Sequence, residues 1–473
     1  MHERVLLLGM GGSSLAPEVI AASYADAPGG SLVVLDSTAP AEIEADAQAA
    51  DLPRAQVFVS SKSGETIETR SHAAYFLERA GDPSRFAAVT DPGSPLEQTA
   101  RDRGFGRVFL NRADIGGRYS ALSFFGLAPA GATGIDPAEM LNRAAAAQAA
   151  CRGFEKNPGF ELGVGLGELA RVGRDKVTFV AQPGLEMFGA WAEQLLAEST
   201  GKDGRGLIPV DGEPVGSPEM YGADRVFVHL RMGLSRANIA KLRALREAGH
   251  PVVEIRVSDA ADLGWLFFVW EFATAVAGWR LGVNPFDEPN VSESKQNTAR
   301  LIEGFEDKGK LPSPKPVARA RGLELYGGDG DDVVAALRSF LRGANPGDYL
   351  ALQAFIPRND VTAKGLRDVR TLIRDRLRVA TTAGFGPRFL HSTGQLHKGG
   401  PATGRFLQIT AEHKTDVPIP GKKFSFGVLQ AAQAAGDFDS LERHDRPVVR
   451  VHLRSEPSRG LSTLARLVRE ALA

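Results

Sequence analysis

The chain up to Leu110 repeats one pattern, in which a short β-rich run is followed by a helical segment. The β-rich runs are continuously apolar, and continuous apolar strands separated by helices are typical of a parallel sheet covered on both faces. The predicted strands are Val5–Gly9, Leu32–Asp36, Val57–Ser60, Phe86–Thr90 and Val108–Leu110, with helices near Ser13–Tyr24, Ala39–Ala49, Thr66–Ala80 and Ser94–Arg103. The pattern predicts an α/β fold with a doubly wound parallel sheet.

The same alternation returns twice further along. A helical region from Ala121 to Gly173 leads to a second unit, with strands predicted at Val177–Ala181, Val226–Leu230 and Val252–Val257 and helices near Glu186–Glu198, Ser235–Ala248 and Leu263–Leu281. The third unit has strands predicted at Tyr349–Phe355, Val379–Thr382, Phe406–Thr410 and Val448–Leu453. We therefore expect a first α/β domain over residues 1–140, a second over 141–308, a linker over 309–327 and a C-terminal α/β region over 328–473.

Composition excludes several classes of protein. The 473 residues carry a net charge of −1, which gives no electrostatic reason to expect a nucleic-acid or membrane partner. Cys151 is the only cysteine, so an internal disulfide and a cysteine zinc site are excluded. We expect no membrane span, because no run of about 18 apolar residues is present. The charged start, Met1 to Arg4, does not resemble a signal peptide, and a cytoplasmic location is expected.

Residues Val57–Thr69, VFVSSKSGETIET, predict a strand, a tight turn at Gly64 and a helix that starts near Glu65. Hydroxyl groups, an ammonium group and the free N–H groups of a helix N-terminus would then converge on one place. Such a place suits a phosphate, because unpaired amides and the positive end of the helix dipole attract anions. The alternative is a Ser/Thr-rich loop with an ordinary N-cap.

Gly9–Ser14, GMGGSS, follows the first predicted strand and would let the backbone approach a ligand closely. A dinucleotide fingerprint is the alternative, with Asp36 as the acid that binds the ribose. That motif requires a third glycine where this chain has Ser14.

Further along, Arg118 follows two glycines in DIGGRYS, which suggests a guanidinium directed toward an anion or a developing oxyanion. Glu198 and Glu213 lie in Gly-rich stretches and are candidate acid–base groups, although Glu198 could simply end its helix and Glu213 could be solvated.

The stretch Gly384–Gly404 is too rich in Gly, His and hydroxyl residues for a packing element, so we expect a functional loop. It holds His391 and His397, which suit proton transfer near neutral pH. No metal-binding spacing such as H-E-x-x-H is present, so no metal site is expected.

Taken together, the motifs GMGGSS, SSKSGETIET, DIGGRYSALSFFG, ESTGKDGRG, VDGEP, GVNPFDEPNVSESK and FLHSTGQLHKGGP resemble the glucose-6-phosphate isomerase family. The similarity runs from Val5 to the C-terminus and is greatest to the isomerase half of bifunctional transaldolase/glucose-6-phosphate isomerases. GGRYS is its most specific element. The resemblance implies two sugar-isomerase (SIS-type) domains, reversible conversion of glucose 6-phosphate and fructose 6-phosphate through an enediol(ate), and no cofactor.

The resemblance also implies roles for individual residues. Arg118 would stabilise the enediolate, Glu213 would be the base with Glu198 as the alternative, and Lys295 would assist ring opening together with a histidine. The residues expected to hold the sugar and its phosphate are Gly12, Ser13, Ser61, Lys62, Ser63, Thr66 and Thr69.

Three departures from the family pattern are visible. Glu288 stands where the family usually has Gln, and its carboxylate could repel a phosphosugar. The ring-opening histidine has no clear match after Glu213, so we assign that role to His391 or His397 as a hypothesis, from this subunit or another. The chain also starts almost at its first strand, which leaves open a separately encoded transaldolase as a partner. A homodimer is a separate expectation. A non-catalytic sugar-phosphate sensor and an isomerase that also accepts mannose 6-phosphate remain alternatives.

Overall fold

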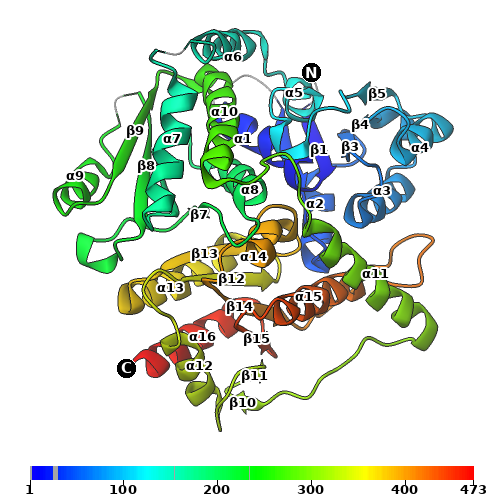
Figure 1. The fold of residues 1–473 in the computed structure, drawn as a ribbon. Helices are drawn as coiled ribbons and strands as arrows, with labels where there is room; N and C mark the ends of the chain where they lie inside the picture. The colour runs from blue at the N-terminus through cyan, green and yellow to red at the C-terminus, as the bar shows by residue number, and fades with distance from the viewer. Residues whose placement is uncertain (1–2, 25–29, 154, 234) are drawn as a thin grey trace.

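A computed structural model describes residues 3–24, 30–153, 155–233 and 235–473. Their strands form three sheets, one centred on each of the three predicted α/β stretches (Figure 1). The third sheet also takes in Ala318–Ala320 and Leu323–Tyr326, which lie in the predicted linker. The predicted α/β class with parallel sheets is confirmed. The division into residues 1–140, 141–308, 309–327 and 328–473 remains our proposal for the domains.

The first sheet is parallel throughout, with strand order β2-β1-β3-β4-β5. The chain leaves β1 for β2 on one side and returns to β3 on the other. Ligands of such sheets bind at this reversal, beyond the carboxyl ends of the strands. Gly9 at the end of β1 pairs with Ser60 at the end of β3, so the two predicted ligand loops emerge side by side. The elements are β1 (Arg4–Gly9), α1 (Leu15–Ser23), β2 (Ser31–Leu35), α2 (Pro40–Ala49), β3 (Gln56–Ser60), α3 (Ile67–Ala80), β4 (Phe86–Thr90), α4 (Pro95–Arg103), β5 (Arg107–Leu110) and α5 (Phe124–Ala132).

The second sheet is also parallel, with order β7-β6-β8-β9. The sequence pattern missed β7, because that strand has only three residues and contains Pro209, which lacks a backbone donor. The elements are α6 (Ala138–Ala150), α7 (Pro158–Arg171), β6 (Lys176–Ala181), α8 (Phe188–Thr200), β7 (Ile208–Val210), β8 (Arg225–Met232), α9 (Ile239–Glu247), β9 (Val252–Val257), α10 (Leu263–Leu281) and α11 (Val291–Lys308).

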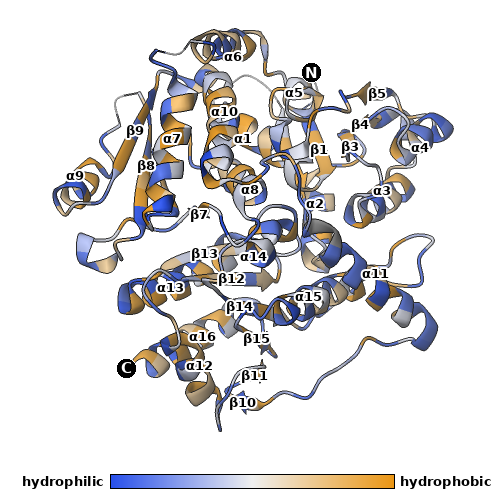
Figure 2. Cartoon of the chain, viewed as in Figure 1, coloured by the Kyte–Doolittle hydropathy of each residue, from blue (hydrophilic) through white to orange (hydrophobic). Residues whose placement is uncertain are grey.

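Helix α10 qualifies the expectation of no membrane span. Within the described residues, Ala260–Leu281 is the one stretch whose length and composition would allow it to cross a membrane. In the fold, however, 56% of its most apolar window is buried, and α10 packs on α6, α7 and α8. Phe267 and Trp270 lie in the largest hydrophobic core, and Figure 2 shows hydrophobic residues concentrated along this helix. These contacts make α10 a core helix of the second unit.

The third sheet has the order β10-β11-β15-β14-β12-β13. Strands β12 to β15 are parallel, and the short β10 and β11 extend the sheet in antiparallel orientation. The sequence pattern missed β10, β11, α12 and α15. The elements are β10 (Ala318–Ala320), β11 (Leu323–Tyr326), α12 (Val333–Arg342), β12 (Tyr349–Phe355), α13 (Asp360–Leu377), β13 (Ala380–Phe385), α14 (Gly394–Gly399), β14 (Gly404–Ala411), α15 (Phe426–Arg443), β15 (Val448–Leu453) and α16 (Pro457–Leu472).

The stretch 384–404 corrects one expectation, because it does pack. Residues Arg388–His391 form a 3-10 turn and Gly394–Gly399 form α14, which is buried against α8. The close approach depends on glycine: a Cβ atom on Gly201 at the end of α8 would lie 2.5 Å from the Cα of Leu396. The Gly-rich composition therefore reflects dense packing between units.

The third unit also joins the first through apolar contacts and ion pairs. Phe426 and Leu429 of α15 belong to the same hydrophobic core as β1 and β3. Arg388 binds Asp36 and Glu18 of the first unit at 2.7 and 2.6 Å. These contacts carry the segment around His391 to the ligand-binding edge of the first sheet.

Candidate active site

Three distant segments meet at the reversal point of the first sheet, and glycines permit their approach. A Cβ atom on Gly12 would lie 2.1 Å from the carbonyl oxygen of Gly117, next to Arg118. Gly11 has φ +54°, and a Cβ atom there would lie 2.6 Å from the carbonyl oxygen of His391. The GMGGSS loop therefore serves first to bring the Arg118 loop and the His391 turn together, and any side chain at Gly12 would separate them.

Arg118 lies at the centre of this site with only 2% of its side chain exposed. Its Nε donates to Ser199 Oγ at 2.8 Å, and its Nη2 donates to the carbonyl oxygen of Pro285 at 2.8 Å. Its Nη1 faces two carboxylates, Glu288 at 2.8 Å and Glu198 at 3.4 Å. Burial disfavours the charge, but Glu198 and Glu288 hold the pKa of Arg118 above its usual value, so the guanidinium is a fixed positive charge.

Glu198 lies in the last turn of α8, and its carboxylate faces Nη1 of Arg118. Its side chain is 13% exposed, and burial raises its pKa despite the attraction of Arg118. Gln194, one turn earlier on α8, donates to Glu198 Oε2 at 3.0 Å and fixes its orientation. A carboxylate with a raised pKa beside a fixed cation is suited to general base catalysis near neutral pH.

His391 reaches the site from the third unit. Its Nε2 lies 2.9 Å from Glu68 Oε1 on α3, and its carbonyl oxygen accepts from Gln194 at 2.8 Å. Burial alone would raise the pKa of Glu68, but His391 and its hydrogen bond hold that pKa below the usual value. Gln194 thus links His391 to Glu198, and Glu68 remains ionised to orient the imidazole.

The predicted phosphate loop has the expected strand, turn and helix, with α3 starting at Ile67. Gly64 has φ +70°, and a Cβ atom there would lie 2.6 Å from the backbone nitrogen of Leu96, so this turn requires glycine. Ser61 Oγ lies 3.2 Å from Thr66 Oγ1. Among the described residues, the buried Thr69 Oγ1 has no hydrogen-bond partner. Hydroxyl groups are therefore available beside the N-terminus of α3.

Lys62 differs from the other residues of this loop. Its ammonium forms an ion pair with Asp91 and donates to the carbonyl oxygen of Ala113 at 2.9 Å. Its charge is already compensated, so the structure gives Lys62 a role in holding the loop rather than a free charge for a phosphate. Ser63 is exposed, and its Oγ accepts from the backbone nitrogen of Glu65 at 3.2 Å.

The structure places Glu213 in a different cluster from Arg118. Its carboxylate binds Arg225 at 3.0 Å, accepts from Thr381 Oγ1 at 2.7 Å and lies 3.8 Å from Arg374. Its side chain is fully buried, and although burial favours the neutral form, Arg225 holds its pKa below the usual value. These contacts join the second unit to the third, whereas Glu198 is the carboxylate that the fold brings to Arg118.

A carboxylate at Glu288 could repel a phosphosugar, but here it pairs with Arg118 and is 45% exposed. Lys202 holds the loop that carries Glu288. Its Nζ binds Asp287 Oδ1 at 2.6 Å and donates to the carbonyl oxygen of Asn284 at 2.7 Å. The negative charge of Glu288 is therefore neutralised by the cation that the reaction would use.

Three candidates remain, and they lie in different surroundings. His397 is buried among Tyr349, Phe389 and Phe406, and burial lowers its pKa well below the usual value, so it is a neutral core residue. Lys295 is exposed on α11, a helix that packs against the 3-10 turn carrying His391. Ser13 is buried beside Gly12.

Sequence patterns did not identify Gln194, Glu68 or Ser199 as residues of the site. Gln194 and Glu198 are four residues apart on one helix, a spacing that places them on one face, so Gln194 could have been found. Glu68 and Ser199 gave no such signal, because their partners are far away in the sequence.

Asp36 is the acid that would bind the ribose of a dinucleotide, but it is buried in an ion pair with Arg388. This contact argues against dinucleotide binding. Over the described ranges, no group of three or more His, Cys, Asp or Glu residues is arranged to hold a metal ion.

Comparison with known proteins gives one decisive match. The glucose-6-phosphate isomerase of Listeria monocytogenes serovar 1/2a is 30% identical over 305 residues, which cover 53% of this chain and 67% of the relative. The chain belongs to the glucose-6-phosphate isomerase family. The glucose-6-phosphate isomerase of Symbiobacterium thermophilum is 31% identical over 298 residues, covering 52% of this chain and 66% of that relative. No model of a known protein family matches the chain.

Two solved structures share the fold. A hypothetical protein from Thermus thermophilus superposes with a TM-score of 0.56 at 25% identity, over 63% of this chain and 83% of that one. A glucose-6-phosphate isomerase from Chlamydia trachomatis gives a TM-score of 0.55 at 21% identity, over 65% and 71% of the two chains, and shows the shared fold. The resemblance to the isomerase family is thus confirmed, while the similarity to transaldolase fusions stays a prediction.

Proposed function

We propose that this chain catalyses the reversible isomerisation of glucose 6-phosphate and fructose 6-phosphate. The observation that carries the proposal is the pairing of Glu198, a buried carboxylate with a raised pKa, with the buried cation Arg118. Both lie beside the hydroxyl-rich loop at the reversal point of the first sheet. The relatives named glucose-6-phosphate isomerase support the same reaction.

In the proposed mechanism, Glu198 removes the proton from C2 of the open-chain aldose and returns it to C1. The charge that develops on the enediolate oxygens is stabilised by Arg118, which the fold holds in place before the substrate binds. Preorganised charge of this kind contributes about 3–4 kcal/mol in comparable sites. Arg118 must then exchange its contact with Glu288 for one with the substrate.

Ring opening is assigned to His391, whose imidazole is oriented by Glu68. It would take the proton from the sugar hydroxyl and deliver one to the ring oxygen, with Lys295 as the assisting cation. The phosphate is assigned to Ser61, Ser63, Thr66 and Thr69 at the start of α3. None of these steps uses a metal ion or an organic cofactor.

The direct test is a coupled assay with fructose 6-phosphate, run in parallel with mannose 6-phosphate. We expect turnover of fructose 6-phosphate to glucose 6-phosphate. Phosphosugar-dependent thermal stabilisation without turnover would instead identify the protein as a sugar-phosphate sensor. Comparable turnover of mannose 6-phosphate would broaden the substrate class.

The phosphate loop makes a separate prediction. Removing two hydroxyls in Ser63→Ala/Thr66→Ala should raise KM for fructose 6-phosphate about 100-fold or more, because each lost hydrogen bond to a charged group costs roughly 1.5–3 kcal/mol. Steady-state kinetics measures the effect, and Thr99→Val on the exposed surface of α4 is the control. An unchanged KM would place the phosphate elsewhere.

His391 should matter most for the cyclic substrate. In His391→Ala, turnover of glucose 6-phosphate presented in the ring form should fall about 100-fold or more, the lower range for a lost acid–base group. Exchange of the C2 proton in the open-chain form should fall less. Equal losses for both forms would remove His391 from ring opening, whereas His397→Ala should lower the melting temperature because it empties a core position.

We further propose a cytoplasmic location, a homodimer and a separately encoded transaldolase as the functional companion. The single cysteine fits a reducing compartment and supports the location. Light scattering on the purified protein tests the dimer, and copurification with a transaldolase tests the second partner.

A further inference from the structure

The third sheet repeats the topology that creates the catalytic site in the first. From β12 the chain goes to β13 on one side and then returns to β14 on the other, as it goes from β1 to β2 and back to β3. In parallel sheets, this reversal opens a crevice at the carboxyl ends of the strands. The proposed isomerase reaction uses the crevice of the first sheet and leaves that of the third unused.

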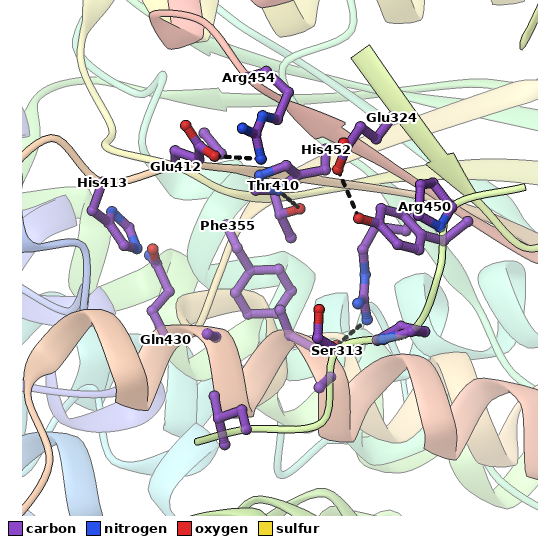
Figure 3. Close-up of a pocket in the computed structure, with 18 of the residues that line it drawn as sticks. Ser313, Glu324, Phe355, Thr410, Glu412, His413, Gln430, Arg450, His452 and Arg454 are labelled. Atoms are coloured by element: carbon purple, nitrogen blue, oxygen red, sulfur yellow. Dashed lines mark hydrogen bonds and ion pairs between the residues drawn. The ribbon is translucent and has the colours of Figure 1, made fainter. Parts of the chain in front are cut away.

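An open cavity of about 850 Å³ lies at this second crevice (Figure 3). Phe355 ends β12, and it lies in register with Thr410 and His452, each one residue before the end of β14 and β15; all three line the cavity. Helix α15 forms the opposite wall with Gln430, and the linker residues Leu311–Pro316 pass along one side. The volume is in the range of small-molecule sites.

The charges around the cavity favour an anion. Arg319 is paired with Glu324 at 2.9 Å, and Arg454 is paired with Glu412 at 2.6 Å. Within the described part of the chain, neither Arg450 nor Lys315 forms an ion pair with a carboxylate. Lys414, which also lines the cavity, pairs with Glu456, and Asp416 is the lining carboxylate that no cation pairs with in the described residues. The lining cations therefore outnumber the lining carboxylates, and the cavity carries a net positive charge.

Arg450 is held rigidly although it has no carboxylate partner. Its Nε donates to Gln408 Oε1 at 2.6 Å, its Nη2 donates to the carbonyl oxygen of Ala434 at 3.2 Å, and its guanidinium lies 4.6 Å from the ring centre of Phe438. In Figure 3, Arg450 lies on one wall with Phe355 between it and Gln430. A half-buried guanidinium fixed by neutral partners is well suited to bind a phosphate.

The remaining walls suit an organic body attached to that phosphate. Tyr326 offers an aromatic surface, Phe355 lies buried beneath the cavity with 1% of its surface exposed, and Ala431, Ala434 and Ala435 line the helix side. His452 Nδ1 lies 2.9 Å from Thr410 Oγ1, which leaves its other nitrogen available for a polar contact. We propose that this cavity binds a small phosphate monoester, with its phosphate at Arg450 and Lys315 and its organic part against Tyr326.

Isothermal titration of the full chain tests this proposal, with phenyl phosphate and inorganic phosphate as probes at constant ionic strength. The titrations use the Ser63→Ala/Thr66→Ala variant, in which binding at the catalytic loop is weakened. One phenyl phosphate should still bind per chain. Adding Arg450→Gln and Lys315→Glu should weaken that binding at least tenfold, whereas Lys310→Glu, which matches the charge change of Lys315→Glu but lies outside the cavity, should alter it less than twofold.

Three results would overturn the proposal: no residual binding in the loop variant, unchanged affinity after the two cavity substitutions, or equal affinity for inorganic phosphate and phenyl phosphate. The last would indicate a site for an inorganic anion only. Circular dichroism checks folding, and if Arg450→Gln proves unstable, Lys315→Glu alone decides. In the otherwise wild-type chain, the cavity substitutions should leave fructose 6-phosphate turnover within twofold, so the outcome is independent of the isomerase assignment.

Discussion

Glu198→Gln should lower kcat for fructose 6-phosphate by about 10²–10⁴-fold, the range for a lost general base, while KM changes little. The amide keeps the shape of the side chain and can still bond to Gln194, so substrate binding and stability should both persist. Stopped-flow or coupled steady-state assays measure the loss, and exchange of the C2 proton with solvent should disappear in parallel.

The matched control is Glu213→Gln, the same chemical change at the other candidate carboxylate. If Glu213→Gln abolished turnover in a fully folded protein while Glu198→Gln remained active, the assignment of the base would be reversed. The structure predicts the opposite because Glu198, not Glu213, contacts Arg118.

Glu213→Gln should instead destabilise the fold by about 3–5 kcal/mol, the usual cost of removing one member of a buried ion pair. Arg225 is 0% exposed and would be left without the carboxylate that now lies 3.0 Å away. Chemical denaturation should show a lower midpoint with a similar slope, and the remaining folded protein should still isomerise fructose 6-phosphate.

The stability lost in Glu213→Gln should be larger at neutral pH than in acid. The pKa of Glu213 is lowered in the folded protein, so its ionised form stabilises the fold at pH values above the unfolded-state pKa of about 4.3. That contribution is lost as the pH falls through the lower, folded-state pKa. The difference in stability between wild type and Glu213→Gln should therefore be greatest near neutral pH and shrink in acid.

Local patterns were sufficient to predict most of the parallel strands. The strand Phe86–Thr90 was predicted to the residue, and the strand and helix around Gly64 were placed within two residues, because apolar runs and caps are local signals. By contrast, β7 and β11 are short, and the amphipathic α12 lies beyond the Pro-rich linker, where no catalytic motif drew attention.

The acid–base residues were harder to assign, because their environment is set by tertiary contacts. Glu198 and Glu213 look alike in sequence, each in a Gly-rich stretch, and only the fold shows that one faces Arg118 and the other Arg225. The arginine was identifiable because two glycines precede it. His391 could be proposed but not distinguished from His397, whose burial depends on Tyr349 and Phe406.

The contact between His391 and Glu68 spans 323 residues and therefore imposes an order of events during protein synthesis. At about 5–20 residues per second, the ribosome needs roughly 15–65 s to extend the chain from Glu68 to His391. During that interval, the first sheet also lacks the apolar cover that Phe426 and Leu429 later provide. The nascent chain therefore exposes an incomplete site and apolar surface of the first sheet that is covered only later. Because chaperones bind transiently exposed apolar surface, we expect the unfinished chain to depend on them.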